Sequence, residues 1–400
     1  MLRRAAYSFI MEERLGKRRI CVATSGRADY GLLTWPMRDI AAAGGLSLQL
    51  LVTGTHLEEG HGMTVGGIEA DGFAVDARVP MDLTADDPAG LARSSAACLT
   101  GAVEALERLQ PDILMLLGDR FETLALAQAA MLTGVPVAHI GGGDVTEGAI
   151  DEGIRHALTK LSHLHLVTHE DAARRVIRMG EAPDRVHVVG NPGLDMLTRA
   201  PAMARDALEA RLGRPLGAKN LLVTFHPVTT LPDKGRSELD ALLKALEPMG
   251  DATLWITRAN ADPGGMAFNA AFEAFARGRS NVSLHDALGP AYLPLLAVCD
   301  AVVGNSSSGL AEAPSVRTPT VDIGLRQAGR LAGPSVIRCA AEPAPICAAI
   351  ARAMAGEVGG FDNPYGDGQS SARIVQALIS APPRDILLRK RFFDGEPPHA

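Results

Sequence analysis

Acidic residues and an arginine follow two apolar stretches that have the composition of buried strands. Residues 113–117 lead into Gly118-Asp119-Arg120, and residues 135–140 lead into three glycines and an acid-rich loop. Carboxylates held beside a substrate can act as general acid and general base, and an arginine can hold an anion next to them. The sequence therefore predicts a site at these strand ends, beside the acids Asp119, Asp144, Glu147, Asp151 and Glu152.

A purely structural interpretation of this stretch is a turn at Gly118 followed by a helix whose first turn carries solvated acids. Helix capping alone explains neither Arg120 nor the glycine run at 141–143. Ligands of open parallel α/β sheets bind outside the carboxyl ends of the strands, and both acidic segments lie at such ends. We therefore interpret the stretch as part of a binding site.

Two further strand ends have the composition of an anion-binding site. The β-rich run 19–25 precedes Gly26-Arg27, and the run 301–303 precedes GNSSSG, which contains Ser306 and Ser307. A strand, a glycine turn and a helix N-terminus present backbone N–H groups to an anion, and arginine can chelate phosphate. The first loop lacks the GxGxxG spacing of a dinucleotide site. We expect a diphosphate site, with a serine-rich helix cap as the alternative for the second loop.

Four more polar residues belong to loops that follow expected strands. His56 and Arg326 each lie close after a strand, and Asn260 belongs to a polar loop. Glu312 lies near a helix start that would receive phosphate, where a carboxylate suits a ribose hydroxyl better than the anion itself. We expect these residues to contact a sugar or a nucleotide.

Strands and helices alternate along most of the chain, which is the pattern of a doubly wound parallel sheet. The pattern restarts after Gly190-Asn191-Pro192-Gly193, and 400 residues exceed what one hydrophobic core usually supports. We therefore expect an α/β protein with two such domains whose facing strand ends line a central cleft. The expected divisions are a flexible extension at 1–17, a first domain at 18–192, a second at 193–380 and a C-terminal tail at 381–400.

The composition is that of an ordinary globular protein, with 47% hydrophobic and 21% charged residues. A formal charge of −7 argues against nucleic acid or an anionic membrane as a partner. No apolar run reaches the roughly 18 residues that a membrane helix needs. The five cysteines show no metal-ligand spacing and suit buried thiols in a reducing cytoplasm. We expect a cytoplasmic protein without a metal or other cofactor.

Six motifs together resemble those of the hydrolysing UDP-N-acetylglucosamine 2-epimerases of sialic and legionaminic acid synthesis. The resemblance runs from about residue 19 to 380 in the same order. It implies a GT-B-like fold, with two Rossmann-like domains and a terminal helix that crosses back to the first. The motifs are GRADYG at 26–31, GDRFE at 118–122, AIDEGIRHALTKLSHLH at 149–165, FHPVTT at 225–230, GNSSSG at 304–309 and IGLRQAGR at 323–330.

The resemblance also implies a reaction, a substrate and an assembly. UDP leaves C1 of a UDP-2-acetamido sugar, the C2 proton is removed, and hydration of the glycal gives the free C2 epimer, such as N-acetylmannosamine. The implied substrate is UDP-N-acetylglucosamine, with a UDP- or GDP-linked diacetamido-trideoxy sugar as the alternative. A homodimer or homotetramer is expected. The family's catalytic positions fall on Asp119, Asp151 and His226, its nucleotide and diphosphate contacts on Arg27, Ser306, Ser307, Glu312 and Arg326, and further motif positions on His56, Arg120 and Arg155.

One position departs from the family pattern. Many members carry an acid at the third position of HIEGGE, where this chain has Gly141 in HIGGGD. Asp144 lies three residues further on, and flexible Gly142-Gly143 would let its carboxylate reach the sugar. Glu147 is the second candidate for the missing carboxylate.

Three other functions fit parts of the pattern. A retaining GT-B glycosyltransferase would use the same diphosphate site but needs an acceptor site and fewer acids. A non-hydrolysing epimerase would release no free sugar, and His-Pro-Val-Thr at 226–229 resembles the hydrolysing branch instead. A catalytically idle sensor of nucleotide sugars would have no need of Asp119 and Asp151.

Overall fold

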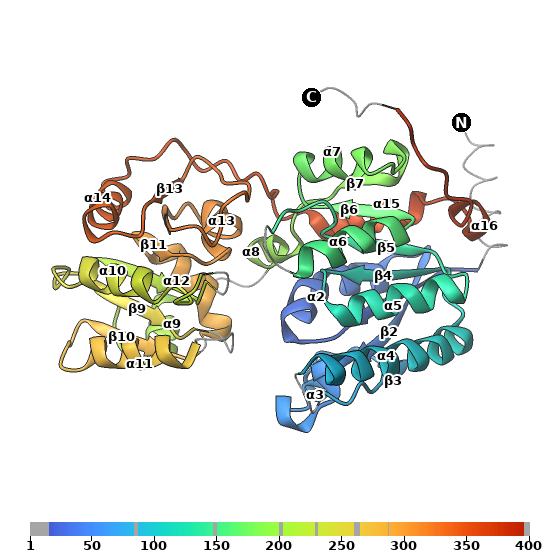
Figure 1. Cartoon of the computed structure of the whole chain (residues 1–400), viewed down its shortest axis with the longest axis horizontal. Coiled ribbons are helices and arrows are strands. Elements are labelled where there is room, and N and C mark those ends of the chain that lie inside the picture. Colours follow the sequence, from blue (N-terminus) through green and yellow to red (C-terminus); the bar gives the residue numbers. More distant parts are fainter. Residues whose placement is uncertain are drawn as a thin grey trace. The chain divides into compact units, whose positions relative to one another are not determined.

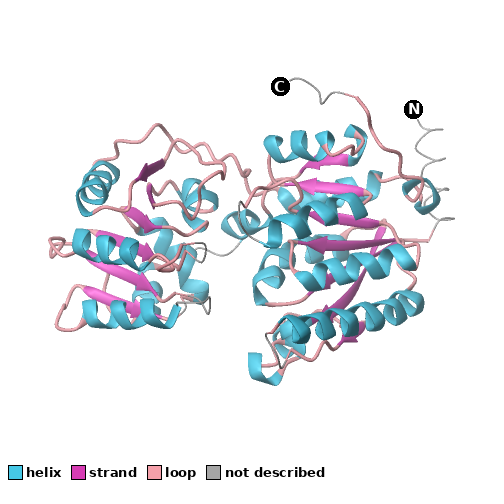
Figure 2. Cartoon of the chain, in the orientation of Figure 1, coloured by secondary structure: helices cyan, strands magenta, loops and turns pink. Residues whose placement is uncertain are grey.

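The computed structural model describes residues 16–83, 87–146, 150–199, 203–228, 231–259, 265–286 and 288–395. The chain divides into two compact units, each built on its own sheet with helices beside the strands (Figures 1 and 2). The first unit comprises Met1–Val145, Ala149–Met196 and Gly368–Ala400, and the second comprises Thr146–Gly148 and Leu197–Asp367.

The first unit contains a seven-stranded parallel sheet. Its strand order is β3-β2-β1-β4-β5-β6-β7, so the order reverses between β1 and β4. Its strands are β1 (Arg18–Thr24), β2 (Leu46–Thr53), β3 (Ala77–Val79), β4 (Ile113–Leu117), β5 (Val137–Ile140), β6 (Leu164–Val167) and β7 (Val186–Val188). Its helices are α2 (Arg27–Ala42), α3 (Val65–Ala70), α4 (Pro88–Leu109), α5 (Phe121–Leu132), α6 (Ile150–Leu161), α7 (Glu170–Arg178), α15 (Ser370–Ser380) and α16 (Arg384–Leu387).

Both faces of this sheet are buried, as expected for parallel strands flanked by helices. Alternate residues of β1 enter different cores: Ile20 packs on the side of α2 and α15, whereas Cys21 packs on the side of α4 and α5. In β4, Met115 and Leu116 divide in the same way. A one-residue slip would exchange the two faces, so the packing fixes the register and with it the position of the strand ends.

The second unit contains a six-stranded parallel sheet of order β10-β9-β8-β11-β12-β13, which reverses between β8 and β11. The strands are β8 (Asn220–Thr224), β9 (Thr253–Thr257), β10 (Val282–His285), β11 (Ala301–Gly304), β12 (Thr320–Ile323) and β13 (Val336–Cys339). The helices are α9 (Arg205–Leu212), α10 (Arg236–Leu246), α11 (Gly265–Ala276), α12 (Tyr292–Val298), α13 (Ser308–Ala311) and α14 (Pro343–Met354), and α8 (Asp195–Arg199) lies at the division between the units.

Alternate residues of β8 again enter two cores. Val223 joins the core that includes α10, α11 and α14, whereas Leu222 joins Trp255 in the core that includes α9 and α12. The indole Nε1 of Trp255 donates to the Asn220 side chain at 3.1 Å, which satisfies its only polar group. The two doubly wound parallel sheets confirm the expected α/β architecture.

The end of the chain belongs to the first unit. Helix α15, drawn in red in Figure 1, packs against α2 in a common core. The carboxylate of Asp195 accepts the backbone N–H groups of Ser370 and Ser371, at 2.8 and 2.6 Å, and so caps the first turn of α15. The division therefore falls after residues 196 and 367 rather than at the expected 192–193 and 380.

The expected C-terminal tail is also structured in its described part. Helix α16 and the segment after it lie against the first unit, where the backbone N–H of Phe393 donates to the carbonyl of Gly180 at 2.9 Å. Of the expected N-terminal extension, residues 1–15 lie outside the described residues. Among the helices that the structure describes, none is both long and apolar enough to cross a membrane.

Candidate active site

The two points where strand order reverses carry several of the candidate residues. At such a switch point, the connections from neighbouring strands run in opposite directions and leave a crevice at the carboxyl ends. In the first unit, β1 ends before Ser25 and β4 ends before Gly118-Asp119. In the second unit, β8 ends before Phe225-His226 and β11 ends before Asn305. We describe them as the acidic half-site and the diphosphate half-site.

The turn after β1 is held by Asp29, which lies in the first turn of α2. Its carboxylate accepts the backbone N–H groups of Ser25 and Gly26, at 2.6 and 2.7 Å. Arg27 occupies the first position of α2 with its side chain exposed. Its guanidinium makes no ion pair with any residue that the structure describes, so the capped turn presents a cation beside the β1–β4 crevice.

Arg155 is the centre of the acidic half-site. Its guanidinium is only 4% exposed and contacts Asp119 at 2.5 Å and Glu152 at 2.6 Å. It also donates to the backbone carbonyl of Asp144 at 2.9 Å. The guanidinium is a rigid fork of donors, so a buried arginine that contacts several groups fixes their positions relative to one another. The predicted substrate residue Arg155 therefore orients Asp119 and ties α6 to the loop after β5.

Asp151 lies in the first turn of α6 and differs electrostatically from Asp119. Burial raises the pKa of Asp151, and the charge of Asp119 raises it further, whereas the guanidinium groups of Arg155 and Arg120 act in the opposite direction. Two carboxylates that influence each other in one crevice favour one protonated and one ionised group. The Arg155 cation lies against Asp119, so Asp151 is the carboxyl of the pair whose surroundings raise the pKa.

Arg120 lies mostly at the surface beside this pair. Its side chain is 60% exposed and contacts the buried carboxylate of Glu122 at 2.5 Å. The second oxygen of Glu122 is buried without a hydrogen-bond partner among the described residues. The arrangement leaves most of the Arg120 side chain accessible to an anionic ligand.

Asp144 is turned towards α7. His169 Nδ1 accepts the N–H of Ala172 at 3.1 Å, so its proton lies on Nε2, which donates to Asp144 at 2.8 Å. Thr168 contacts the same carboxylate at 3.4 Å. The structure therefore gives Asp144 a partner on α7, and no described contact joins its carboxylate to Asp119 or Asp151. Glu147 lies outside the described residues.

His56 does not present its ring to the crevice, contrary to the expected substrate contact. The side chain is fully buried, with Nε2 at 3.0 Å from the hydroxyl of Thr24 and Nδ1 at 2.7 Å from the hydroxyl of Thr64. Burial lowers its pKa and keeps the ring neutral. His56 therefore fixes the end of β2 from inside the core.

Asn305 organises the diphosphate half-site. Its side chain accepts the N–H of His226 at 2.8 Å and donates to the carbonyl of His226 at 2.9 Å, which joins the ends of β8 and β11. The Asn305 carbonyl accepts from Arg326 at 3.0 Å and from Gln327 at 2.9 Å. A Cβ at Gly304 would lie 1.9 Å from the Thr224 carbonyl oxygen, so only glycine permits this close approach. His226, Asn305 and Arg326 are thereby brought together.

The helix after the serines is shorter than expected. Helix α13 has only four residues and is followed by a 3₁₀ turn at Ala313–Val316. Pro314 has no N–H and its ring would clash with the carbonyl four residues earlier, which ends the α-helix. A four-residue helix has little macrodipole, so the donors that this loop can offer an anion are its N–H groups, the hydroxyls of Ser306 and Ser307, and Arg326.

Glu312 has an enclosed carboxyl group next to this loop. Burial raises the pKa of Glu312 to about 7, although a hydrogen bond from Ser308 opposes the shift. Its Oε2 is buried and has no hydrogen-bond partner among the described residues. An acceptor of this kind suits a ligand hydroxyl, and the ribose contact of Glu312 stays a prediction. Asn260, also expected at the nucleotide, lies outside the described residues.

The comparisons with known proteins agree with this geometry. A family model described as UDP-N-acetylglucosamine 2-epimerase matches residues 38–379. The chain belongs to the UDP-N-acetylglucosamine 2-epimerase family. It is similar to the GDP/UDP-N,N'-diacetylbacillosamine 2-epimerase (hydrolyzing) of Campylobacter jejuni, with 36% identity over 81% of this chain and 84% of that protein. The UDP-N,N'-diacetylbacillosamine 2-epimerase (hydrolyzing) of Legionella pneumophila is 33% identical over 93% of this chain and 98% of that protein.

Solved structures of UDP-N-acetylglucosamine 2-epimerases share the fold. The crystal structure of the enzyme from Neisseria meningitidis, bound to UDP-GlcNAc, covers 91% of this chain and 100% of its own, with a TM-score of 0.77 and 18% identity. The likeness confirms the GT-B-like class inferred from the motifs. Membership of the family confirms the resemblance itself.

Three residues of the two half-sites were not singled out for a role by the sequence. Glu152 shares Arg155 with Asp119, His169 holds Asp144, and Asn305 joins two strand ends. Glu152 belongs to the acid-rich loop and Asn305 to GNSSSG, so their motifs gave a signal. In the sequence, nothing distinguishes His169 from an ordinary helix cap. Its contact with Asp144 is visible only in the folded chain.

Proposed function

We propose that this protein is a hydrolysing 2-epimerase that converts a UDP-linked 2-acetamido sugar to the free C2 epimer and UDP. The observation that carries the proposal is a pair of carboxylates, Asp119 directly after β4 and Asp151 in the first turn of α6. Asp119 is paired with the Arg155 guanidinium, and the pKa of Asp151 is raised by burial and by the charge of Asp119. Two carboxylates in such different surroundings can divide the roles of base and acid, which is what proton exchange at C2 needs.

The reaction begins with loss of the diphosphate. The C1–O bond breaks with its electron pair on the departing diphosphate, while Asp119 takes the C2 proton and a C1=C2 double bond forms. Ser306, Ser307 and Arg326 in one half-site, and Arg27 in the other, are the donors assigned to the departing anion. Preorganised donors of this kind stabilise charge that develops in the transition state. His226, two residues after the end of β8, is the third residue on which a catalytic position of the family falls.

Hydration of the glycal then completes the reaction. Water adds its oxygen at C1 and releases one proton, and Asp151 delivers a proton to the face of C2 opposite to the one that lost it. Proton exchange with solvent then returns Asp119 to the carboxylate and Asp151 to the acid, so that one proton is released with the UDP. Each well-placed acid or base group contributes roughly 10²–10⁴-fold. Asp144 or Glu147 is proposed as the third carboxylate, which replaces the acid that many family members carry at the position of Gly141. Loss of turnover in Asp144→Asn but not in Glu147→Gln would assign it to Asp144, and the reverse to Glu147.

The sugar is proposed from the relatives' names together with the motifs. The relatives from Campylobacter and Legionella are named for N,N'-diacetylbacillosamine, and the Neisseria structure holds UDP-GlcNAc. We therefore assign the substrate class as a nucleotide-linked 2-acetamido sugar, with UDP-N-acetylglucosamine and UDP-N,N'-diacetylbacillosamine as its two members to compare. A Cβ at Gly141 would meet no atom within 4 Å, which is space that a substituent of the larger sugar can use.

A substrate panel tests the proposal. The protein is incubated with the UDP- and GDP-linked forms of both sugars, and the products are identified by mass spectrometry and by the C2 configuration of the released sugar. Free UDP with a C2-inverted free sugar is expected from at least one UDP-linked member. Transfer of the sugar to an added acceptor, without epimerisation, would support a glycosyltransferase instead. Binding without turnover of any member would support a sensor.

A further inference from the structure

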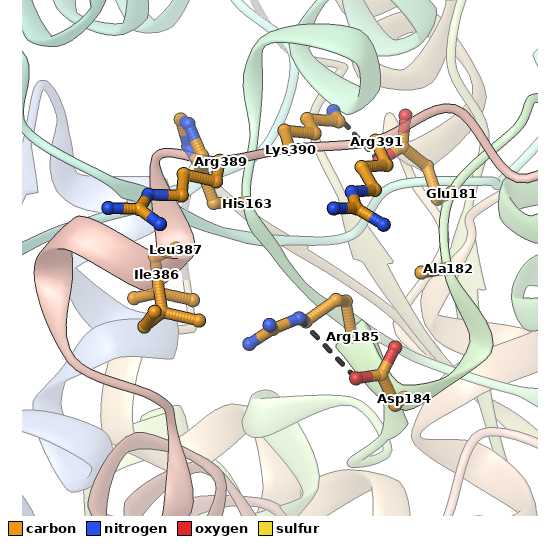
Figure 3. Close-up of a pocket in the computed structure, with 10 residues that line it drawn as sticks. All are labelled: His163, Glu181, Ala182, Asp184, Arg185, Ile386, Leu387, Arg389, Lys390 and Arg391. Carbon is orange, nitrogen blue, oxygen red and sulfur yellow. Dashed lines mark ion pairs between the residues drawn. The ribbon is translucent and has the colours of Figure 1, made fainter.

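The first unit contains a cavity outside the acidic half-site. Its volume is about 380 Å³, and it is enclosed by the stretch 181–185, which leads into β7, and by the C-terminal segment 386–391 (Figure 3). None of the residues assigned to the acidic half-site lines it. A cavity of this size falls within the range of small-molecule sites.

Cations outnumber carboxylates in the lining. The side chains of Arg185, Arg389, Lys390 and Arg391 face two acids, Glu181 and Asp184. Glu181 is already neutralised, because its carboxylate contacts Lys160 at 2.5 Å, Lys390 at 2.8 Å and His165 at 2.9 Å. Burial opposes ionisation, yet hydrogen bonds from these three groups lower the pKa of Glu181 to about 2. This carboxylate is therefore committed to its own cluster.

The three arginines have little else to balance their charge. Arg185 approaches Asp184 only to 3.6 Å, and the Asp184 side chain is 75% exposed. The guanidinium groups of Arg389 and Arg391 form no ion pair or hydrogen bond with any residue in the described part of the chain. Figure 3 shows all three arginines around the same open space. Like charges gathered in one cavity repel each other, and a bound anion removes that cost.

The other walls define what kind of anion fits. His163 Nδ1 accepts the N–H of Val137 at 3.2 Å, and burial lowers its pKa to about 4, so the ring is neutral with its proton on Nε2. Ile386, Leu387 and Ala182 form an apolar wall. The cavity therefore combines several donors for oxygen atoms with a surface for a carbon skeleton.

We propose that this cavity binds a small organic phosphate, with the phosphate oxygens on Arg185, Arg389 and Arg391 and the carbon skeleton against Ile386 and Leu387. Three guanidinium forks exceed what one carboxylate can occupy, whereas a phosphate offers three oxygens and up to two charges. Lys390 already ties the C-terminal segment to the carbonyls of Lys160 and Ser162, both at 2.7 Å. A ligand that bridges Arg185 and Arg391 adds a second link between this segment and β7.

The test uses the full chain and phenyl phosphate as the probe, with binding followed by calorimetry and by hydrogen exchange of peptides covering 181–186 and 384–393. Saturation slows exchange in both peptides, and phenyl phosphate binds more tightly than inorganic phosphate because of the apolar wall. Arg185→Ala and Arg391→Ala each weaken binding about ten-fold or more, as expected for loss of a charge-assisted hydrogen bond. Arg391→Lys, which keeps the charge but loses the fork, has a smaller effect.

Two control variants separate this cavity from general charge and from the diphosphate half-site. Arg178→Ala removes an exposed arginine of α7 that does not line the cavity and leaves phenyl phosphate affinity unchanged. Arg326→Ala weakens UDP binding but not phenyl phosphate protection of the two peptides, and Arg391→Ala does the reverse. The inference is overturned if Arg185→Ala and Arg391→Ala bind like the parent protein, or if neither peptide is protected. Binding only to phosphatidylglycerol vesicles, and not to phenyl phosphate, would also overturn it.

Discussion

At the scale of single residues, Asp119 and Asp151 have the same side chain but different surroundings. The Arg155 guanidinium lies 2.5 Å from Asp119, whereas burial and the Asp119 charge raise the pKa of Asp151. Neither effect is visible in the spacing of the two residues along the chain. These contacts are the basis on which we propose Asp119 as the base and Asp151 as the acid.

Replacing either aspartate tests that assignment. Asp119→Asn and Asp151→Asn should each lower turnover by at least about a hundred-fold, with little change in UDP affinity, because a proton-transfer group is lost while the diphosphate donors remain. Turnover is measured by UDP release and affinity by calorimetry. Glu104→Gln, an exposed acid on α4, is the matched control and should behave like the parent protein. Near-normal turnover in either aspartate variant would remove that residue from the proton transfers.

Glu312 gives a prediction about pH and stability. Its folded pKa of about 7 lies above that of an unfolded glutamate, so the folded state binds more protons between the two values. The free energy of unfolding therefore falls as the pH rises through this window, because an unpaired carboxylate must ionise inside the fold. Glu312→Gln should match the parent protein at about pH 5 and be more stable than it at about pH 8 by urea denaturation. A stability difference that is independent of pH would contradict the claim that burial raises the pKa of Glu312.

At the scale of elements, long apolar or periodic segments were predictable and short ones were not. The strand expected at 113–117 is β4, and the long helix α4 that precedes it begins at Pro88, where the side chain of Asp87 caps it. The strand expected at 135–140 starts only at Val137, since Pro136 has no N–H to donate. Strand β3 has three residues, too few for a period to be read.

The direction of a side chain was harder to predict than its element. His56 follows a strand as expected, but its ring lies between Thr24 and Thr64 in the core. Asp144 follows β5 as expected, but α7 supplies a histidine that holds its carboxylate. Both outcomes depend on residues distant in the chain, which local patterns do not report.

The cap of α15 supports an element-scale prediction. Asp195 is fully buried and accepts two backbone N–H groups at the start of α15. Asp195→Asn should lower the free energy of unfolding by about 1–3 kcal/mol, because a neutral amide is a weaker acceptor and directs one N–H at a backbone N–H. Asp385→Asn, at an exposed position of α16, is the control. Equal urea midpoints for Asp195→Asn and the parent protein would show that the cap contributes nothing.

At the scale of the whole molecule, the two-unit organisation was predictable and its boundaries were not. The alternation of strands and helices predicts two parallel sheets, and both are present. Residues 368–400 return to the first unit through contacts such as Asp195 with Ser370. The family resemblance implied a terminal helix that crosses back, whereas no composition shift marks where the crossing occurs. Most of the motifs that identified the family begin at or just after the end of a strand, where the fold leaves side chains available for chemistry.

The central claim is that a glycal forms and is hydrated to a free sugar, and isotope incorporation tests it most directly. The protein is incubated with UDP-N-acetylglucosamine, and separately with UDP-N,N'-diacetylbacillosamine, in D₂O and in ¹⁸O-labelled water. For the true substrate, the released sugar should carry deuterium at C2 and ¹⁸O at C1, with unlabelled UDP as the other product. An epimerised nucleotide sugar that remains intact as the only product, or a free sugar without deuterium at C2, would contradict the account.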